Sequence, residues 1–204
     1  MPGGLRGDLQ RLFSDRGLDS GRPGLGLALE RVLTRPGPLA ILMYRASHRL
    51  WVSHQEVAAE LLWRLNYFLT GADIHPGAEI GGGLRMTHTT GIVIGRGAKI
   101  GSNVTMLHGV TMGGSAKWWF DNAFADGFPE VGDDTLIMAG AFLLGPIRVG
   151  RGCFIGANAV LARDLPDGEA YTPGREMAAL RRRVEDLEHR IAELERQGVV
   201  RLEE

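Results

Sequence analysis

The chain has 204 residues, of which 44% are hydrophobic and 23% are charged, which is the composition of an ordinary globular protein. A formal net charge of −1, with no basic block in the first 170 residues, argues against electrostatic binding to nucleic acid. The single cysteine, Cys153, excludes an intrachain disulfide and is interpreted as a small buried apolar residue. The sequence starts without an apolar signal core and contains no run of about 18 apolar residues, so we expect a cytoplasmic protein with no membrane partner.

Residues 1–70 are predicted to form a helical domain that packs on the first part of the segment that follows. Pro36 and Pro38 interrupt this region near its middle. The apolar residues that recur there at helical spacing are Leu27, Leu29, Val32 and Leu33, then Leu39, Leu42, Met43, Leu50 and Trp51, then Val57, Leu61, Leu62 and Leu65.

Residues 71–173 contain a six-residue repeat. Every sixth residue from Ile74 onward is apolar as far as Val110, the register is lost across residues 113–130, and it resumes at Val131. The residues at these places are Ile74, Ile80, Met86, Ile92, Ala98, Val104 and Val110, then Val131, Ile137, Leu143, Val149, Ile155 and Leu161.

A repeat of this length predicts a parallel β-helix. Each unit fits one short strand and one turn, and three units close a triangular coil whose apolar residues point into a narrow prism. The 30 glycines of the chain suit the corners, where positive φ is required, and stacked coils pair their backbones with one another. We therefore predict a mainly β fold, with a loop at 113–130 that protrudes from the β-helix.

Residues 174–204 are predicted to form a coiled-coil helix. Six apolar residues recur at spacings of three and four, and the places between them are mostly charged. An amphipathic helix lying on its own subunit is the alternative. Val and Ile at one core place with Leu at the other favour two strands, which conflicts with the trimer that a β-helix prism usually forms. The six residues are Met177, Leu180, Val184, Leu187, Ile191 and Leu194.

Among the six histidines, His88 is the strongest candidate for catalysis. A neutral imidazole can take the proton of a hydroxyl group that attacks a thioester, and a carboxylate on the far ring nitrogen fixes the tautomer. Asp73, which opens the repeat, could supply that carboxylate across adjacent coils. His108 lies on a coil face and is a weaker candidate, and the other histidines are interpreted as structural or solvated.

Four segments together resemble the serine O-acetyltransferase family of hexapeptide-repeat acyltransferases. They are residues 71–81 (GADIHPGAEIG), 88–95 (HTTGIVIG), 109–117 (GVTMGGSAK) and, in the helical region, 42–51 (LMYRASHRLW). The resemblance covers roughly residues 20–175 and implies a left-handed β-helix that forms a homotrimer or a pair of trimers. It also implies a catalytic pair at His88 and Asp73, with acetyl-CoA as cosubstrate and no metal.

By the same resemblance, acetyl-CoA lies in the groove between two neighbouring prisms. Small residues there let the pantetheine arm approach the backbone, and corner residues of the coil are the plainer interpretation of some of them. The matching positions are Gly113, Gly114, Ser115, Ala139, Gly140 and Ala157, with Lys117 as a candidate for the CoA phosphates.

The chain departs from the family where the family recognises serine. Arg22 and Thr87 stand where aspartates are expected, and Phe128 falls where an Arg-His pair precedes proline. Trp118 and Trp119 lie in the central loop, either over the acceptor or against a neighbouring subunit. Charged groups of free serine left unpartnered would cost several kcal/mol, so we expect a small-molecule acceptor other than free L-serine.

The sequence thus predicts an acyl-CoA-dependent O-acyltransferase. A genuine serine O-acetyltransferase of cysteine biosynthesis with altered serine contacts, or a non-catalytic scaffold or regulator, are the alternatives. A γ-type carbonic anhydrase is disfavoured because His75, His88 and His108 are not spaced as a close zinc-binding set. Since the chain ends in Arg201 and three further residues after the coiled coil, we expect no cysteine synthase complex.

Overall fold

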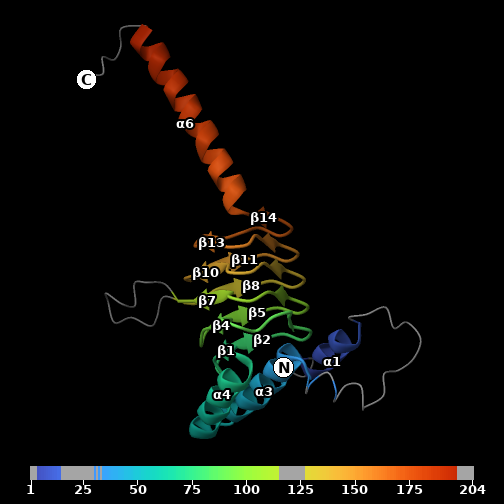
Figure 1. Cartoon of the computed structure of the whole chain (residues 1–204). Coiled ribbons are helices and arrows are strands. Elements are labelled where there is room, and N and C mark those ends of the chain that lie inside the picture. Colours follow the sequence, from blue (N-terminus) through green and yellow to red (C-terminus); the bar gives the residue numbers. More distant parts are fainter. Residues whose placement is uncertain (1–3, 15–29, 31, 33, 115–126, 197–204) are drawn as a thin grey trace. The chain divides into compact units, whose positions relative to one another are not determined.

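The computed structural model of the chain describes residues 4–14, 30, 32, 34–114 and 127–196. The chain divides into two compact units, Met1–Tyr171 and Thr172–Glu204. The first unit holds helices α1, α3 and α4 and all the strands, and the second holds helix α6 (Figure 1). The finer division of the sequence at residues 70 and 173 stays a prediction.

Helices α3 (Pro36–Val52) and α4 (Glu56–Thr70) pack against each other at the start of the β-helix. The two prolines lie in the first turn of α3, where a missing backbone N–H costs nothing, so they begin this helix rather than break it. Gly71 caps the C-terminus of helix α4 in the left-handed conformation, with a φ of +73°. The buried Asn66 side chain donates to the Ala40 carbonyl at 3.1 Å and thereby joins the two helices.

The helices are also tied to the first coil by polar contacts. The buried Tyr44 hydroxyl donates to the Ala78 carbonyl at 2.7 Å, and burial raises the pKa of Tyr44 to about 12. Helix α1 (Gly4–Ser14) supplies Asp8, which pairs with Arg45 at 2.8 Å and accepts the Gly83 N–H at 2.8 Å. The N-terminal helices are therefore fixed on the β-helix.

The strands wind into a parallel β-helix with three sheets (Figure 1). Sheet A has the order β1-β4-β7-β10-β13, sheet B has β11-β8-β5-β2, and sheet C has β14-β12-β9-β6-β3. The strands are β1 (Asp73–Ile74), β2 (Glu79–Ile80), β3 (Arg85–Met86), β4 (Val93–Ile94), β5 (Lys99–Ile100), β6 (Thr105–Met106), β7 (Thr111–Gly113), β8 (Glu130–Val131), β9 (Leu136–Ile137), β10 (Phe142–Leu144), β11 (Arg148–Val149), β12 (Phe154–Ile155), β13 (Val160–Leu161) and β14 (Ala170–Tyr171).

All thirteen apolar positions of the predicted repeat are buried, with exposed fractions of 4% or less. They nevertheless do not form a single column. Ile74 pairs with Ile94, twenty residues on, whereas Ile94 pairs with Met112, eighteen residues on. Two extra residues therefore lie between Met86 and β4. After them the predicted positions from Ile92 to Val110 fall on the buried place before each strand, and from Val131 onward they lie within the strands again. The sequence hid this shift because both places are apolar.

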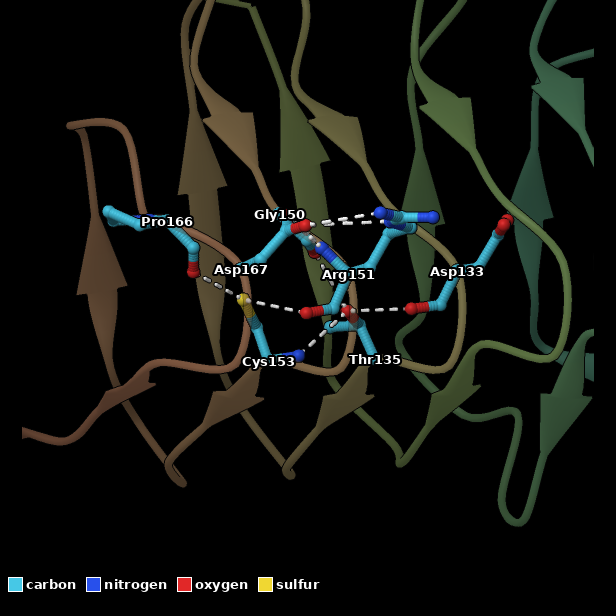
Figure 2. A network of polar contacts seen from close by, with 7 residues as sticks. All are labelled: Asp133, Thr135, Gly150, Arg151, Cys153, Pro166 and Asp167. Atoms are coloured by element: carbon cyan, nitrogen blue, oxygen red, sulfur yellow. Dashed lines mark hydrogen bonds and ion pairs between the residues drawn. The ribbon is translucent and has the colours of Figure 1, made fainter.

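Side chains and backbone groups hold the corner between sheets B and C (Figure 2). The Thr135 hydroxyl accepts the Cys153 N–H at 3.2 Å, and the Cys153 thiol contacts the Pro166 carbonyl at 3.1 Å. One Asp167 oxygen accepts the Arg151 N–H at 2.8 Å. Burial raises the pKa of the Cys153 thiol, which fits the predicted structural role of this residue.

The outward faces of the sheets differ in character. On sheet B, Glu79, Lys99, Glu130 and Arg148 are paired in register and alternate in charge. On sheet A, the outward Val93, Phe142 and Val160 are 38%, 42% and 56% exposed. Sheet B therefore presents a solvated ladder of charges, while sheet A presents apolar side chains.

Helix α6 (Pro173–Arg196) forms the described part of the second unit. Its six heptad residues are 39–55% exposed in the single chain. None of the helices that the structure describes is both long enough and apolar enough to span a bilayer.

Candidate active site

His88 lies on the two-residue insertion, at the corner where the chain passes from sheet C to sheet A. We call this the C–A corner; it comprises residues 87–92, 107–110, 138–141 and 156–159. The Thr89 hydroxyl donates to the Thr70 carbonyl at 2.5 Å, and the Gly91 N–H donates to Gly71 at 3.2 Å. These bonds anchor the corner while the side chains of Thr87 and His88 remain exposed.

His108 occupies the next coil of the same corner. Its ring centroid lies 5.9 Å from that of His88, with the ring planes at 73°. Both side chains are exposed. The structure thus brings together two imidazoles that the sequence placed 20 residues apart, although the sequence ranked His108 as the weaker candidate.

Asp73 is half-buried on β1, and its hydrogen-bond donor is Trp63 rather than His88. The Trp63 indole N–H, from α4, donates to Asp73 Oδ1 at 2.8 Å. Within the part of the chain that the structure describes, no hydrogen bond or ion pair joins Asp73 to His88. The sequence did not predict the hydrogen bond from Trp63. The only signal for it was the helical spacing of α4, which indicates which residues face the first coil.

His75 has a structural environment beside Asp73. Its Nδ1 atom accepts the Gly77 N–H at 2.9 Å, and its ring packs on Trp51 and Trp63 with centroids 5.2 and 4.7 Å away. Burial, followed by the nearby charge of Arg96, lowers the pKa of His75, so its neutral form is favoured.

Several of the predicted acetyl-CoA residues line up along the C–A corner with the two histidines. The backbone N–H of Gly140 donates to the His108 carbonyl at 2.9 Å, and that of Asn158 donates to Ala139 at 2.9 Å. Gly140 has a φ of +68°, and a Cβ atom there would collide with Asn158. Ala157 is exposed on the last of these coils. The corner therefore offers a column of small residues beside His88.

The other predicted site residues fall elsewhere or outside the described chain. Gly113 and Gly114 lie at the end of β7. The Phe128 ring packs over Gly95 and Gly97, at the corner between sheets A and B. Within a single chain, Phe128 therefore lies away from the C–A corner. Arg22, Ser115, Lys117, Trp118 and Trp119 lie outside the described residues.

No group of three or more His, Cys, Asp or Glu side chains is arranged to hold a metal ion among the residues that the structure describes.

The model of the family "Bacterial transferase hexapeptide (six repeats)" matches residues 128–163. The serine acetyltransferase of Helicobacter pylori strain 26695 is 44% identical over 139 residues, which are 68% of this chain and 78% of that protein. The chain belongs to the serine acetyltransferase family.

Further relatives extend this result. The serine acetyltransferase of Mycobacterium tuberculosis is 42% identical over 144 residues, which are 71% of this chain. The crystal structure of Neisseria gonorrhoeae serine acetyltransferase in complex with serine matches with a TM-score of 0.70 and 34% identity, over 83% of this chain and 66% of that one. The chain spans 61% of the length of the Mycobacterium tuberculosis relative. The resemblance inferred from the sequence motifs is thereby confirmed, and with it the left-handed β-helix and a family of CoA-dependent acyltransferases.

Proposed function

We propose that the chain transfers an acetyl group from acetyl-CoA to a small acceptor at the C–A corner, with His88 as the general base. One observation carries this proposal: the exposed His88 lies on an insertion at the head of a column of small residues that includes Ala139, Gly140 and Ala157. Family membership supports acetyl-CoA as the cosubstrate. In this proposal the pantetheine arm follows the column and bonds the backbone, with Gly113, Gly114, Ser115 and Lys117 as further contacts.

The reaction needs one proton acceptor and one carbonyl centre. The neutral His88 imidazole takes the proton of the acceptor hydroxyl as its oxygen attacks the thioester carbon. The carbon–sulfur bond of the resulting tetrahedral species then breaks, and the imidazolium returns the proton to the departing CoA sulfur. The protein is restored at the end of the cycle and forms no covalent bond to the acetyl group.

Asp73 is proposed to orient His88 once substrates are bound. The Trp63 indole occupies Oδ1 of Asp73, and Oδ2 accepts no hydrogen bond from any described residue. That oxygen is available to accept a ring N–H of His88, because hydrogen bonds of a catalytic site often tighten only in the substrate complex. Asp73→Asn should therefore lower kcat by less than His88→Ala does.

The acceptor is proposed to be an alcohol or amine other than free L-serine. Arg22, Thr87 and Phe128 replace charged residues through which relatives are expected to recognise serine, and Trp118 and Trp119 would cover a more apolar acceptor. A genuine serine acetyltransferase is the second candidate, favoured by 44% identity to the Helicobacter pylori enzyme.

Thiol release from acetyl-CoA tests both candidates with the same purified protein. We expect slow turnover with L-serine and faster turnover with larger, more apolar alcohols or amines. Thr87→Asp should raise kcat/KM for L-serine, because it places a carboxylate beside His88 for the substrate ammonium group. Turnover of L-serine at the rate of a true serine acetyltransferase would overturn the proposed acceptor. Absence of release with every acceptor would favour the scaffold alternative.

We further propose that the chain forms a homotrimer, or a pair of trimers, in the cytoplasm. The apolar outward face of sheet A supports burial against another copy, since such a patch is costly in water, whereas the charge ladder of sheet B suits solvent. Phe128, which lies at another corner of its own prism, would reach the acceptor of a neighbouring subunit. Sedimentation of the purified protein measures the assembly directly.

A further inference from the structure

Helix α6 carries a stripe of apolar side chains that is exposed in the single chain. Val184, Leu187 and Ile191 are 52%, 46% and 41% exposed, whereas the thirteen repeat positions of the β-helix are at most 4% exposed. The stripe runs from Met177 to Leu194, about 25 Å at the rise of an α-helix. An apolar stripe of this length on an otherwise charged helix needs a partner surface of matching length that buries it from water.

The spacing of the stripe places the six residues at the core positions of a heptad. Met177, Val184 and Ile191 take one core position, a, and three leucines take the other, d. Both positions are aliphatic throughout this stretch, and no polar residue interrupts them. A second helix with the same pattern therefore fits the stripe layer by layer.

The flanking charges identify which helix that is. The positions beside the core, g and e, carry opposite charges at a separation of five residues: Glu176 and Arg181, Arg183 and Glu188, Arg190 and Glu195. In a parallel, in-register pair of helices each g residue faces the e residue five places on in the other helix. All such pairs between two copies of α6 are then attractive.

Glu188 has no complementary charge within its own helix. Side chains meet along a single helix at separations of three or four residues, and Glu188 has no basic residue at any of those places. Its neighbours at these separations are Val184, Glu185, Ile191 and Ala192. A complement for Glu188 therefore has to come from outside its own helix.

An antiparallel pair of α6 helices is disfavoured by the same charges. When the two helices run in opposite directions with every core layer matched, Arg183 faces Arg183 of the second copy, and Glu188 faces Glu188. Like charges at these two central places destabilise the antiparallel pair, although its outer g–g and e–e pairs are attractive, whereas in the parallel pair every such pair is attractive. Direction and register are thus both encoded in the flanking positions.

We propose that α6 is a self-association surface, which binds the α6 helix of another copy of this chain in parallel and in register. The core layers supply the contact, and the Arg183–Glu188 pairs between copies select the direction. This arrangement is the same for two strands or three, and it does not depend on the proposed acetyl transfer.

Disulfide formation at the far end of the helix tests direction and register in the full-length protein. Leu194→Cys places a thiol at a core position, where two copies face each other only in the parallel arrangement; in an antiparallel pair these thiols lie about 25 Å apart. Mild oxidation should give linked chains from Leu194→Cys, and none from Glu193→Cys, a neighbouring outward position. The wild-type chain is the blank, because its Cys153 is 2% exposed.

Charge reversal then tests the role of the flanking positions in the Leu194→Cys background. Arg183→Glu should slow disulfide linkage about fivefold, because it sets glutamates of two copies against each other. Adding Glu188→Arg should restore the rate. Arg182→Glu makes the same change of charge at an outward position and should alter the rate less than about twofold.

Three results would overturn the proposal. One is the absence of linkage with Leu194→Cys, the second is equal linkage at Glu193→Cys, and the third is an equal effect of the charge reversals at 182 and 183. Helical circular dichroism of each variant separates loss of association from loss of the helix itself.

Discussion

The β-helix and helix α6 both follow a strict apolar period, yet the single chain covers only one of them. The thirteen repeat positions of the β-helix are at most 4% exposed, while the six heptad residues of α6 are 39–55% exposed. A six-residue period returns the chain onto itself, so that each coil covers the one before. A seven-residue period on one straight helix has no such return, and its cover has to come from another helix. The same kind of pattern thus encodes a core within the chain in one region and a seam between chains in the other.

The largest expected effect comes from removing a side chain inside the prism. Leu143→Ala should lower the free energy of unfolding by about 2–5 kcal/mol, because Leu143 is fully buried and the stacked coils can relax little into the cavity. Arg148→Ala, on the solvated outward face of sheet B, is the control and should cost less than about 1 kcal/mol, because its side chain is 81% exposed. Denaturant unfolding measures both, and an effect of the control as large as that of Leu143→Ala would contradict the assigned faces.

A smaller effect, of a different kind, is expected from the stripe of α6. Leu187→Ala should weaken association by about 1.5–3 kcal/mol per chain, since the leucine is buried only between copies. Its cost should depend on protein concentration, unlike that of Leu143→Ala. Thermal melts of α6 helicity over a hundredfold range of protein concentration check this. A loss of stability that does not depend on concentration would mean that Leu187 is buried by its own chain.

A still smaller effect depends on pH and arises where the helices meet the first coil. Because the pKa of folded His75 lies below its ordinary value of 6.5, the unfolded chain binds more protons at mildly acidic pH. The contribution of His75 to stability is therefore full above that value and is lost as the pH falls through the lowered folded pKa. His75→Asn, which can still accept the Gly77 N–H, should flatten this part of the profile of Tm against pH. An unchanged slope would contradict the buried, neutral imidazole.

The smallest effect is expected on the charge ladder of sheet B. Lys99 pairs with Glu130 at 2.8 Å, but both side chains are about half exposed, so water and salt screen the pair. Lys99→Met should change Tm slightly at low salt and not measurably at about 1 M salt. A large, salt-independent shift would mean that sheet B is covered in the assembled protein.

Much of the fold could be predicted because its repeat is local. The inward residues can be counted from the sequence, and so can the heptad of α6. The two-residue insertion at His88 could not be found in this way, because Ile92 and Ile94 are both apolar and both buried. Its detection needs the pairing of Ile74 with Ile94, which is a contact between coils.

The candidate site was harder to predict than the fold because its contacts are not periodic. The Trp63–Asp73 bond depends on how α4 packs on the first coil, and the His88–His108 contact depends on the insertion. Phe128 lies at another corner of its own prism, so its relation to an acceptor requires a second copy of the chain. The catalytic assignment of His88 and Asp73 stays a prediction that rests on motif resemblance and on the exposed C–A corner.

Release of the CoA thiol from acetyl-CoA by three proteins tests the central claim most directly. With an acceptor that the wild type uses, His88→Ala should lower the rate by about 10²–10⁴-fold, because the acceptor proton then has no base. His189→Ala, an exposed histidine of α6, should keep the wild-type rate. A His88→Ala protein that stays folded and releases thiol as fast as the wild type would show that the C–A corner does not hold the base.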